Sequence, residues 1–220
     1  NKWKIASAGS YKFNGTGTTT NIPIIIESIT SGTVNIYLNN VNIETDSGPA
    51  LQIKSDVKAQ VCIYLENENK LISKHRNSAA LQKDNNANLT IDNATNTTPG
   101  TLTAQTYFTD YSKSGWGAGI GSGFGGDSSG SCSNIIINGG SVNASSYFGA
   151  GIGSGRSGSS GSCSNITING GSVNASSTWG AGIGSGFGDG SSGSCSNITI
   201  NGGSVNAIST DGAGIGSGYS

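Results

Sequence analysis

The stretch Gly-Ala-Gly-Ile-Gly-Ser-Gly at residues 117–123 decides the fold, because it returns three more times in the chain. The further copies stand at residues 149–155, 180–186 and 212–218, at spacings of 32, 31 and 32 residues. A second block begins with Cys-Ser-Asn-Ile at Cys132 and recurs, with small changes, in each of the next two units. Self-similarity at a fixed spacing of this size is the signature of a solenoid or another repeat architecture.

The first half of the chain carries the same repeat in a degenerate form. Residues 36–39, 63–66 and 89–92 align with the apolar run at residues 135–138. The widest gap between aligned apolar positions is 39 residues and indicates an insertion around residues 106–114. One apolar column is predicted to pass through the units at Leu51, Leu81, Ile120, Ile152, Ile183 and Ile215.

Apolar and polar residues alternate inside each unit. Ile135 and Ile137 fall on one face of the chain, whereas Asn134 and Ile136 fall on the other. A period of two residues indicates half-buried strands, and Gly-Gly, Ser-Gly and Asn-Gly pairs separate these strands. We therefore predict an all-β fold, a single-stranded right-handed parallel β-helix (solenoid) of about seven coils of 27–39 residues. A β-sandwich is the leading alternative, but it would not preserve a register of 31–32 residues over three units.

The charged residues are distributed unevenly along a single predicted domain. Residues 1–113 hold 19 of the 23 charged side chains, whereas residues 114–220 consist mainly of Gly, Ser and Asn. We interpret residues 1–220 as one continuous β-helix with a degenerate first part and a regular second part. The chain lacks an initiator Met and starts and stops within the repeat, so we expect it to be part of a longer chain.

The composition excludes two classes of partner. A net charge of −1 provides no general attraction to nucleic acid or to an anionic membrane surface. No apolar run is long enough to insert into a membrane as a helix. We therefore expect neither nucleic-acid binding nor membrane insertion.

Two aromatic columns flank the glycine-rich strand and are the candidate ligand surface. Alternation places Trp116 and Phe124 on the same side as Ile120, which favours burial over the core. A row of rings is also what a flat sugar chain needs for stacking contacts. The candidate carbohydrate contacts are Trp116, Phe148 and Trp179 in the first column and Phe124, Arg156, Phe187 and Tyr219 in the second.

Glycines at alternate positions of the same strand predict a bare strip along four coils. In the first copy they are Gly117, Gly119, Gly121 and Gly123, on the face opposite Ile120. Glycine inside a strand often marks the close approach of another surface. The molecule's own Ser/Gly-rich loop is the favoured partner, and a second β-helix or a polysaccharide are the alternatives.

Three cysteines occupy one position in successive units and predict a cysteine ladder, Cys132, Cys163 and Cys195. Adjacent coils bring Cα atoms within disulfide range, so the ladder can hold at most one internal bond, and a row of reduced thiols is the alternative. Cys62 aligns with Asn134, two coils from the ladder, and is expected to remain alone.

The sequence contains no pattern that indicates a site for a metal ion or a cofactor. There is one histidine in the chain, so no Cys/His cluster has the spacing of a zinc site. We predict no metal site and no cofactor.

Eight Asn-X-Ser/Thr sequons are possible N-glycosylation sites. The four in the regular half fall on the outward parity, where a glycan would leave the core undisturbed. The eight are Asn14, Asn88, Asn93, Asn96, Asn143, Asn165, Asn174 and Asn197.

Catalysis is the least favoured function. A single histidine argues against most Ser/His and Cys/His schemes. Polysaccharide lyases and hydrolases with this fold need clustered carboxylates, or Lys and Arg beside calcium-binding Asp residues. Stacking could gather Glu44, Glu66 and Lys70 on one face, but a solvated charged face is the simpler interpretation.

Three segments of the first half resemble a known family. The runs at residues 8–15, 35–43 and 47–51 resemble clostridial β-helix proteins of the cellulose- and pectin-binding type. The Gly-Ala-Gly-Ile-Gly units are similar to repeats in large secreted surface proteins of anaerobic bacteria and some protists. The resemblance implies a pectate-lyase-like fold, an extracellular or cell-surface location and carbohydrate binding without catalysis. Family members often carry calcium on Asp-rich turns, which this chain lacks.

Two functions are therefore expected. The first is a non-enzymatic extracellular module of a surface or matrix glycoprotein that binds polysaccharide or mediates adhesion. The second is a structural subunit of an extracellular filament or sheath, in which copies associate end to end through their open coils.

Overall fold

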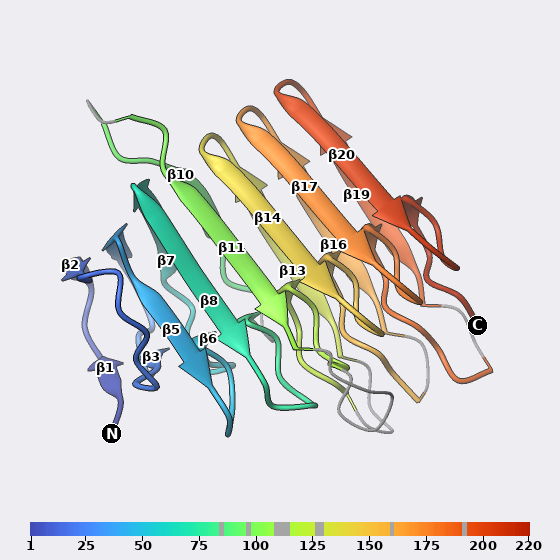
Figure 1. Ribbon diagram of the computed structural model, residues 1–220, viewed down its shortest axis with the longest axis horizontal. Helices are drawn as coiled ribbons and strands as arrows, with labels where there is room; N and C mark the ends of the chain where they lie inside the picture. Colours follow the sequence, from blue (N-terminus) through green and yellow to red (C-terminus); the bar gives the residue numbers. More distant parts are fainter. Residues whose placement is uncertain (84–85, 96–97, 108–114, 126–129, 159–160, 191–192) are drawn as a thin grey trace.

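The computed structural model describes residues 1–83, 86–95, 98–107, 115–125, 130–158, 161–190 and 193–220, and the regular structure in these ranges consists of β-strands (Figure 1). The strands form three parallel sheets, which we call sheets A, B and C. In Figure 1 the coils follow one another in sequence order, and the two termini lie at opposite ends of the stack.

Each sheet takes one strand from each coil that reaches it. Sheet A contains β1 (Trp3–Ile5), β3 (Ile24–Ile26), β6 (Leu51–Ile53), β9 (Leu81–Lys83), β12 (Ile120–Gly121), β15 (Ile152–Gly153), β18 (Ile183–Gly184) and β21 (Ile215–Gly216). Sheet B contains β2 (Gly9–Asn14), β4 (Thr33–Asn39), β7 (Gln60–Glu66), β10 (Leu89–Asn93), β13 (Cys132–Ile137), β16 (Cys163–Ile168) and β19 (Cys195–Ile200). Sheet C contains β5 (Asn42–Thr45), β8 (Glu68–Ser73), β11 (Thr101–Thr106), β14 (Ser141–Ser146), β17 (Ser172–Ser177) and β20 (Ser204–Ser209).

This arrangement confirms the predicted all-β parallel solenoid and has the sheet topology of a right-handed β-helix. About six turns are complete, against the seven or so that were predicted. The first coil explains the difference, because the segment between β2 and β3 contributes only the isolated bridge Thr20–Ile43 instead of a strand of sheet C.

The predicted apolar column forms the centre of the core. Leu51 pairs with Leu81, which pairs with Ile120, and the same register continues to Ile152 and Ile183. All five side chains are fully buried. The sixth member, Ile215 in β21, is 46% exposed, and among the described strands β21 pairs with β18 alone.

The register of two degenerate coils differs from the prediction by two residues in sheet B. Leu89 pairs with Ile135, so residues 89–92 align with residues 135–138 as predicted. Val61 pairs with Leu89 and Val34 with Val61, so residues 61–64 and 34–37, and not 63–66 and 36–39, take the same place. The alternation of apolar and polar residues could not reveal this two-residue error in the alignment. The strand β7 has three inward apolar residues, and a shift of two residues leaves them facing the core. The prediction that Cys62 aligns with Asn134 is therefore wrong, since Cys62 pairs with Thr90, which pairs with Ile136.

The corners between sheets B and C are held by asparagine ladders. The Nδ2 of Asn169 donates to the Oδ1 of Asn138 at 2.9 Å, and Asn201 donates to Asn169 at 2.8 Å. The left-handed residue of each of these corners is a glycine further on, such as Gly140 with φ 83°. Each ladder joins one coil to the next outside the core.

The glycine strip is buried in its first three coils and partly exposed in the last, so the prediction of a bare strip along four coils is wrong. A Cβ atom on Gly119 would lie 2.7 Å from the backbone nitrogen of Ser145 in sheet C and 2.7 Å from the carbonyl oxygen of Gly151 in the next coil. The close approach that the glycines indicate is therefore real, and its partner at Gly119 is the fold's own backbone. At Gly123 the neighbouring loop does take part, because a Cβ on Gly130 would lie 2.6 Å from the Gly123 oxygen.

Candidate functional site

The two predicted aromatic columns meet in one cluster, which we call the aromatic corner. Its rings contact one another edge to face and in stacks, with centroids 4.5 Å apart for Trp116 and Phe124 and 6.2 Å apart for Phe148 and Trp179. The corner comprises Arg76, Trp116, Phe124, Phe148, Arg156, Trp179, Phe187 and Tyr219.

Two arginines occupy much of the ring surface in this corner. The guanidinium carbon of Arg76 lies 3.6 Å from the Trp116 ring centroid, and that of Arg156 lies 4.3 Å from the same centroid. Arg156 also forms an ion pair of 2.7 Å with Asp189, and Phe148 is only 2% exposed. Because cations and neighbouring rings already satisfy these aromatic faces, the corner is mainly a packing cluster. Carbohydrate contact at these residues stays a prediction.

A second surface, on the outer face of sheet B, carries aromatic and polar side chains in open positions. We call it the tyrosine face and define it by Lys12, Tyr37, Asn39, Tyr64 and Glu66. Lys12, Tyr37 and Tyr64 are paired in register on three successive strands, β2, β4 and β7. Tyr37 and Tyr64 point away from the core because they alternate with buried apolar residues, and Lys12 alternates with the partly buried Tyr11 and Phe13.

The two tyrosine rings stack along the solenoid axis. Their centroids are 4.9 Å apart and their planes differ by 20°, and both side chains are half-buried. Burial, and next the neighbouring Cys62 thiol, raise the pKa of the Tyr64 hydroxyl. That hydroxyl therefore stays protonated at neutral pH and can act as both donor and acceptor.

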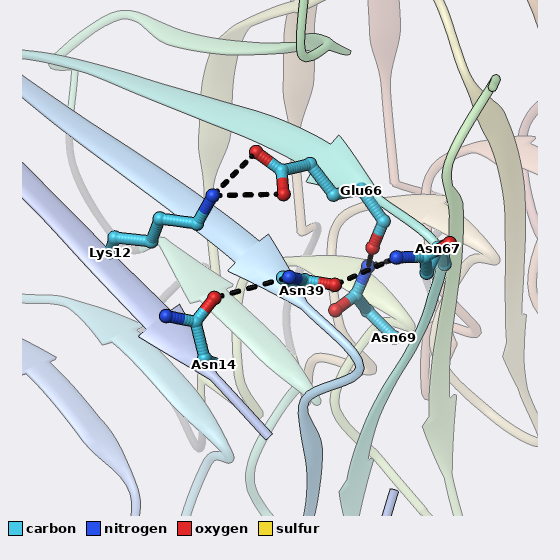
Figure 2. A network of polar contacts seen from close by, with 6 residues as sticks. All are labelled: Lys12, Asn14, Asn39, Glu66, Asn67 and Asn69. Carbon is cyan, nitrogen blue, oxygen red and sulfur yellow. Dashed lines mark hydrogen bonds and ion pairs between the residues drawn. The ribbon is translucent and has the colours of Figure 1, made fainter. Parts of the chain in front are cut away.

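An ion pair on the tyrosine face joins two strands that are not neighbours in the sheet. The Nζ of Lys12 in β2 donates to both carboxylate oxygens of Glu66 in β7, at 3.1 and 3.0 Å, and so spans β4, which lies between them (Figure 2). Figure 2 also shows an amide ladder beside it, in which Asn39 donates to Asn14 at 3.1 Å and Asn67 donates to Asn39 at 2.8 Å.

A buried asparagine fixes the corner next to this ladder. Asn69 is 1% exposed, its Nδ2 donates to the Glu66 carbonyl oxygen at 2.9 Å, and its Oδ1 accepts the Val41 backbone N–H at 3.0 Å. The backbone that carries Glu66 is therefore held rigidly, whereas its carboxylate stays at the surface with Lys12 (Figure 2).

A hollow of about 390 Å³ lies on the tyrosine face. This volume falls in the range of small-molecule sites, roughly 300–1,000 Å³. It offers an aromatic ring, a cation, a carboxylate and hydroxyl groups to one ligand. The residues that line it are Ser10, Tyr11, Lys12, Tyr37, Glu66, Ala94 and Thr95.

A larger hollow of about 820 Å³ opens at the N-terminal end of the solenoid. Its lining includes Trp3, Ile5, Phe13, Val41 and Ile43, most of which belong to the core and its first coil. We interpret it as the open end of the coil stack, and the tyrosine face as the candidate site.

Sequence reasoning missed the tyrosine face. It used Tyr37 and Tyr64 only to align the repeat, although their spacing of 27 residues and their outward parity mark them as stacked surface rings. The ion pair between Lys12 and Glu66 joins residues 54 positions apart, so no short stretch of sequence indicates it.

The cysteine ladder forms in register, and it holds one disulfide. Cys132 pairs with Cys163, which pairs with Cys195. The disulfide joins Cys163 and Cys195, with Cα atoms 4.6 Å apart, whereas Cys132 lies outside it. Cys62 is buried as a free thiol, as predicted, and burial raises its pKa.

The described sequons lie on the surface, and several use their amides in ladders. Asn165 donates to Asn134 at 3.0 Å, Asn197 donates to Asn165 at 3.1 Å, and Asn174 donates to Asn143 at 3.0 Å. Asn96 lies outside the described residues. Glycosylation of the eight sequons stays a prediction.

The carboxylates that stacking could have gathered are kept apart. Glu44 pairs with Lys74, Glu66 pairs with Lys12, and Lys70 lies beside Asn42 in sheet C. No group of three His, Cys, Asp or Glu side chains that could hold a metal ion occurs in the described ranges. The same ranges contain no helix that is long and apolar enough to cross a membrane.

Among the comparisons with known proteins, only the comparison with family models gives a match. No curated protein and no solved structure matches the chain significantly. Residues 1–217 match the family model of the carbohydrate-binding domain-containing proteins. Because this match covers nearly the whole chain, the protein belongs to the carbohydrate-binding domain-containing family.

Proposed function

We propose that the protein is a non-enzymatic module that binds polysaccharide through the tyrosine face. The observation that carries the proposal is the stacked pair of Tyr37 and Tyr64 beside a hollow that also contains Lys12 and Glu66. Membership of a carbohydrate-binding family supports the class of ligand.

The chemistry of the face suits a sugar. A pyranose has apolar C–H faces and a rim of hydroxyl groups, so it needs an aromatic ring together with donors and acceptors at the ring's edge. Tyr37 lines the hollow, and Tyr64 stacks on it from the side of β7. Lys12 donates hydrogen bonds and Glu66 accepts them, and hydrogen bonds to charged groups are stronger than neutral ones.

The scaffold holds this face rigid before a ligand arrives. Tyr37 and Tyr64 sit on neighbouring strands of a continuous parallel sheet, and asparagine amides link the coils at its edge. Rigid contact residues lose little conformational entropy on binding, which favours affinity.

Affinity electrophoresis in gels that contain soluble plant or microbial polysaccharides tests the proposal. We expect retardation in at least one polysaccharide, and we expect Tyr37→Ala to weaken binding by about 1 kcal/mol, or roughly fivefold. Tyr107→Ala is the matched control, because Tyr107 is an exposed tyrosine outside the hollow. The proposal fails if no polysaccharide retards the protein, or if Tyr37→Ala and Tyr107→Ala migrate like the unmodified chain.

The extracellular or cell-surface location is part of the same proposal. The disulfide between Cys163 and Cys195 supports it, because disulfides persist mainly in oxidising compartments. Secretion of the full-length protein, followed by surface labelling of the producing cells, tests this location.

A structural role in a filament or sheath is the second candidate. The observation that favours it is the unpaired edge formed by β19, β20 and β21, where Ile200, Ile208 and Ile215 are 45%, 54% and 46% exposed. Such an edge can pair with the coils of a second copy. Electron microscopy of the purified chain distinguishes end-to-end fibres, which this role requires, from separate particles.

A further inference from the structure

The three ladder cysteines occupy equivalent places in β13, β16 and β19. Cys163 stands in the middle, paired in register with Cys132 on one side and with Cys195 on the other. Cys132 and Cys163 are each 2% exposed, whereas Cys195 in the last coil is partly exposed. The middle cysteine therefore has two equivalent neighbours but can form one disulfide at a time.

The register also sets the direction of a sulfur exchange. A thiolate attacks a disulfide sulfur along the S–S axis, from the side opposite the leaving sulfur. In-register stacking puts Cys132 and Cys195 on opposite sides of Cys163 along the solenoid axis. The coil stack thus supplies the order of attacking, central and leaving groups that the exchange needs.

We propose that the disulfide can move one coil along this ladder. The Cys132 thiol loses its proton, and its thiolate forms a bond with the Sγ of Cys163. The Cys163–Cys195 bond breaks, its electron pair leaves on the Sγ of Cys195, and that sulfur takes up a proton. One disulfide and one thiol are present before and after the step, so no oxidant or reductant is consumed.

Chain entropy does not favour either position. The disulfide between Cys163 and Cys195 closes a separation of 32 residues, and the moved disulfide between Cys132 and Cys163 would close 31. The probability of loop closure depends on length to the power of about 3/2, so the two loops differ by a factor of about 1.05. The isomers therefore differ mainly in the surroundings of the remaining thiol.

The functional consequence is a modification site at the edge of the last coil. The remaining thiol moves from Cys132, where it is 2% exposed, to the partly exposed Cys195. At that position it can attack a low-molecular-weight disulfide or a disulfide of another protein, which forms a mixed disulfide and releases the displaced sulfur as a thiol.

The trypsin sites of the chain make the two isomers easy to distinguish. The last two trypsin sites of the chain are Lys113 and Arg156. Cys132 therefore falls in peptide 114–156, and Cys163 and Cys195 fall together in peptide 157–220. The disulfide seen in the structure stays inside peptide 157–220. The moved disulfide cross-links the two peptides and appears as a single heavier species.

The experiment incubates the folded full chain at pH 8 with a trace of a small thiol, blocks thiols with N-ethylmaleimide, and then unfolds and digests it without reduction. We expect the cross-linked pair of peptides 114–156 and 157–220 in the wild-type chain. In Cys195→Ser, oxidised beforehand with an excess of oxidised glutathione, we expect this pair to account for the whole disulfide, whereas Cys132→Ser retains only the bond inside peptide 157–220. Circular dichroism of each variant checks that the solenoid is intact.

Absence of the cross-linked pair from the incubated wild-type chain would overturn the proposal. The wild-type measurement needs no substitution, so it stays decisive even if Cys195→Ser fails to fold. Cys62 lies in its own tryptic peptide, 59–70, and serves as an internal reference for thiol blocking.

Discussion

Ile152→Ala tests whether residues about thirty apart in the chain form one continuous core. Ile152 is fully buried and lies in register between Ile120 and Ile183, which are also fully buried. The substitution removes three carbon atoms, at about 0.8 kcal/mol each, or roughly 2.4 kcal/mol of lost transfer free energy. The cavity adds a further cost, because rigid coils on both sides cannot collapse into it, so we expect a total near 3–4 kcal/mol.

The same substitution in the last coil provides the matched control. Ile215 is 46% exposed and has a neighbour on one side only, so Ile215→Ala should cost about 1 kcal/mol. Thr199→Ala, at an exposed position of sheet B, should change the free energy of unfolding by less than about 0.5 kcal/mol.

Urea denaturation measures these differences, with tryptophan fluorescence and circular dichroism recorded in parallel. The ranking of Ile152 over Ile215 over Thr199 follows from the stack, and a globule without stacked coils would have no reason to produce it. Equal costs for Ile152→Ala and Ile215→Ala would refute the reasoning.

Three further predictions concern other parts of the solenoid. The pKa of Glu27 is lowered to about 2 by hydrogen bonds from two lysines, so the stability that this carboxylate contributes is complete above about pH 4.5 and is lost as the pH falls toward 2; Glu27→Gln should flatten an acid-unfolding curve in that window. Gly153→Ala should destabilise the chain by at least about 3 kcal/mol in thermal unfolding, because φ is 137° and the new Cβ would lie 1.9 Å from the Gly184 oxygen, whereas Gly48→Ala meets open space. Ser154→Ala removes a fully buried hydroxyl that accepts a 3.0 Å hydrogen bond from an amide of the next coil, and should cost about 1–3 kcal/mol by urea denaturation.

The regular half of the fold could be predicted almost completely from the sequence. Ile120, Ile152 and Ile183 occur in near-identical units, so only one register is possible and the structure has it. In the degenerate half the pattern fixes which side chains face the core but not the register, because a shift of two residues keeps Ile63 buried. The glycine strip was misjudged because period-two alternation says which face a residue occupies and not whether a neighbouring backbone covers it.

The candidate site was less predictable than the fold. The aromatic corner could be assembled from repeat positions, but the guanidinium of Arg76 over Trp116 could not, because Arg76 belongs to a coil without that repeat. The ion pair between Lys12 and Glu66 depends on a long side chain that reaches over a whole coil. The choice of Cys163 and Cys195 for the disulfide could not be made either, since the sequence offers two equivalent pairs.

Hydroxyl-radical footprinting of the chain with and without a bound polysaccharide shows whether the tyrosine face is the surface that contacts the ligand. We expect bound polysaccharide to lower the oxidation of Tyr37, while Trp179 and the exposed Tyr219 of the aromatic corner are oxidised as in the free protein. Protection of Trp179 and Tyr219, with Tyr37 unchanged, would contradict this expectation.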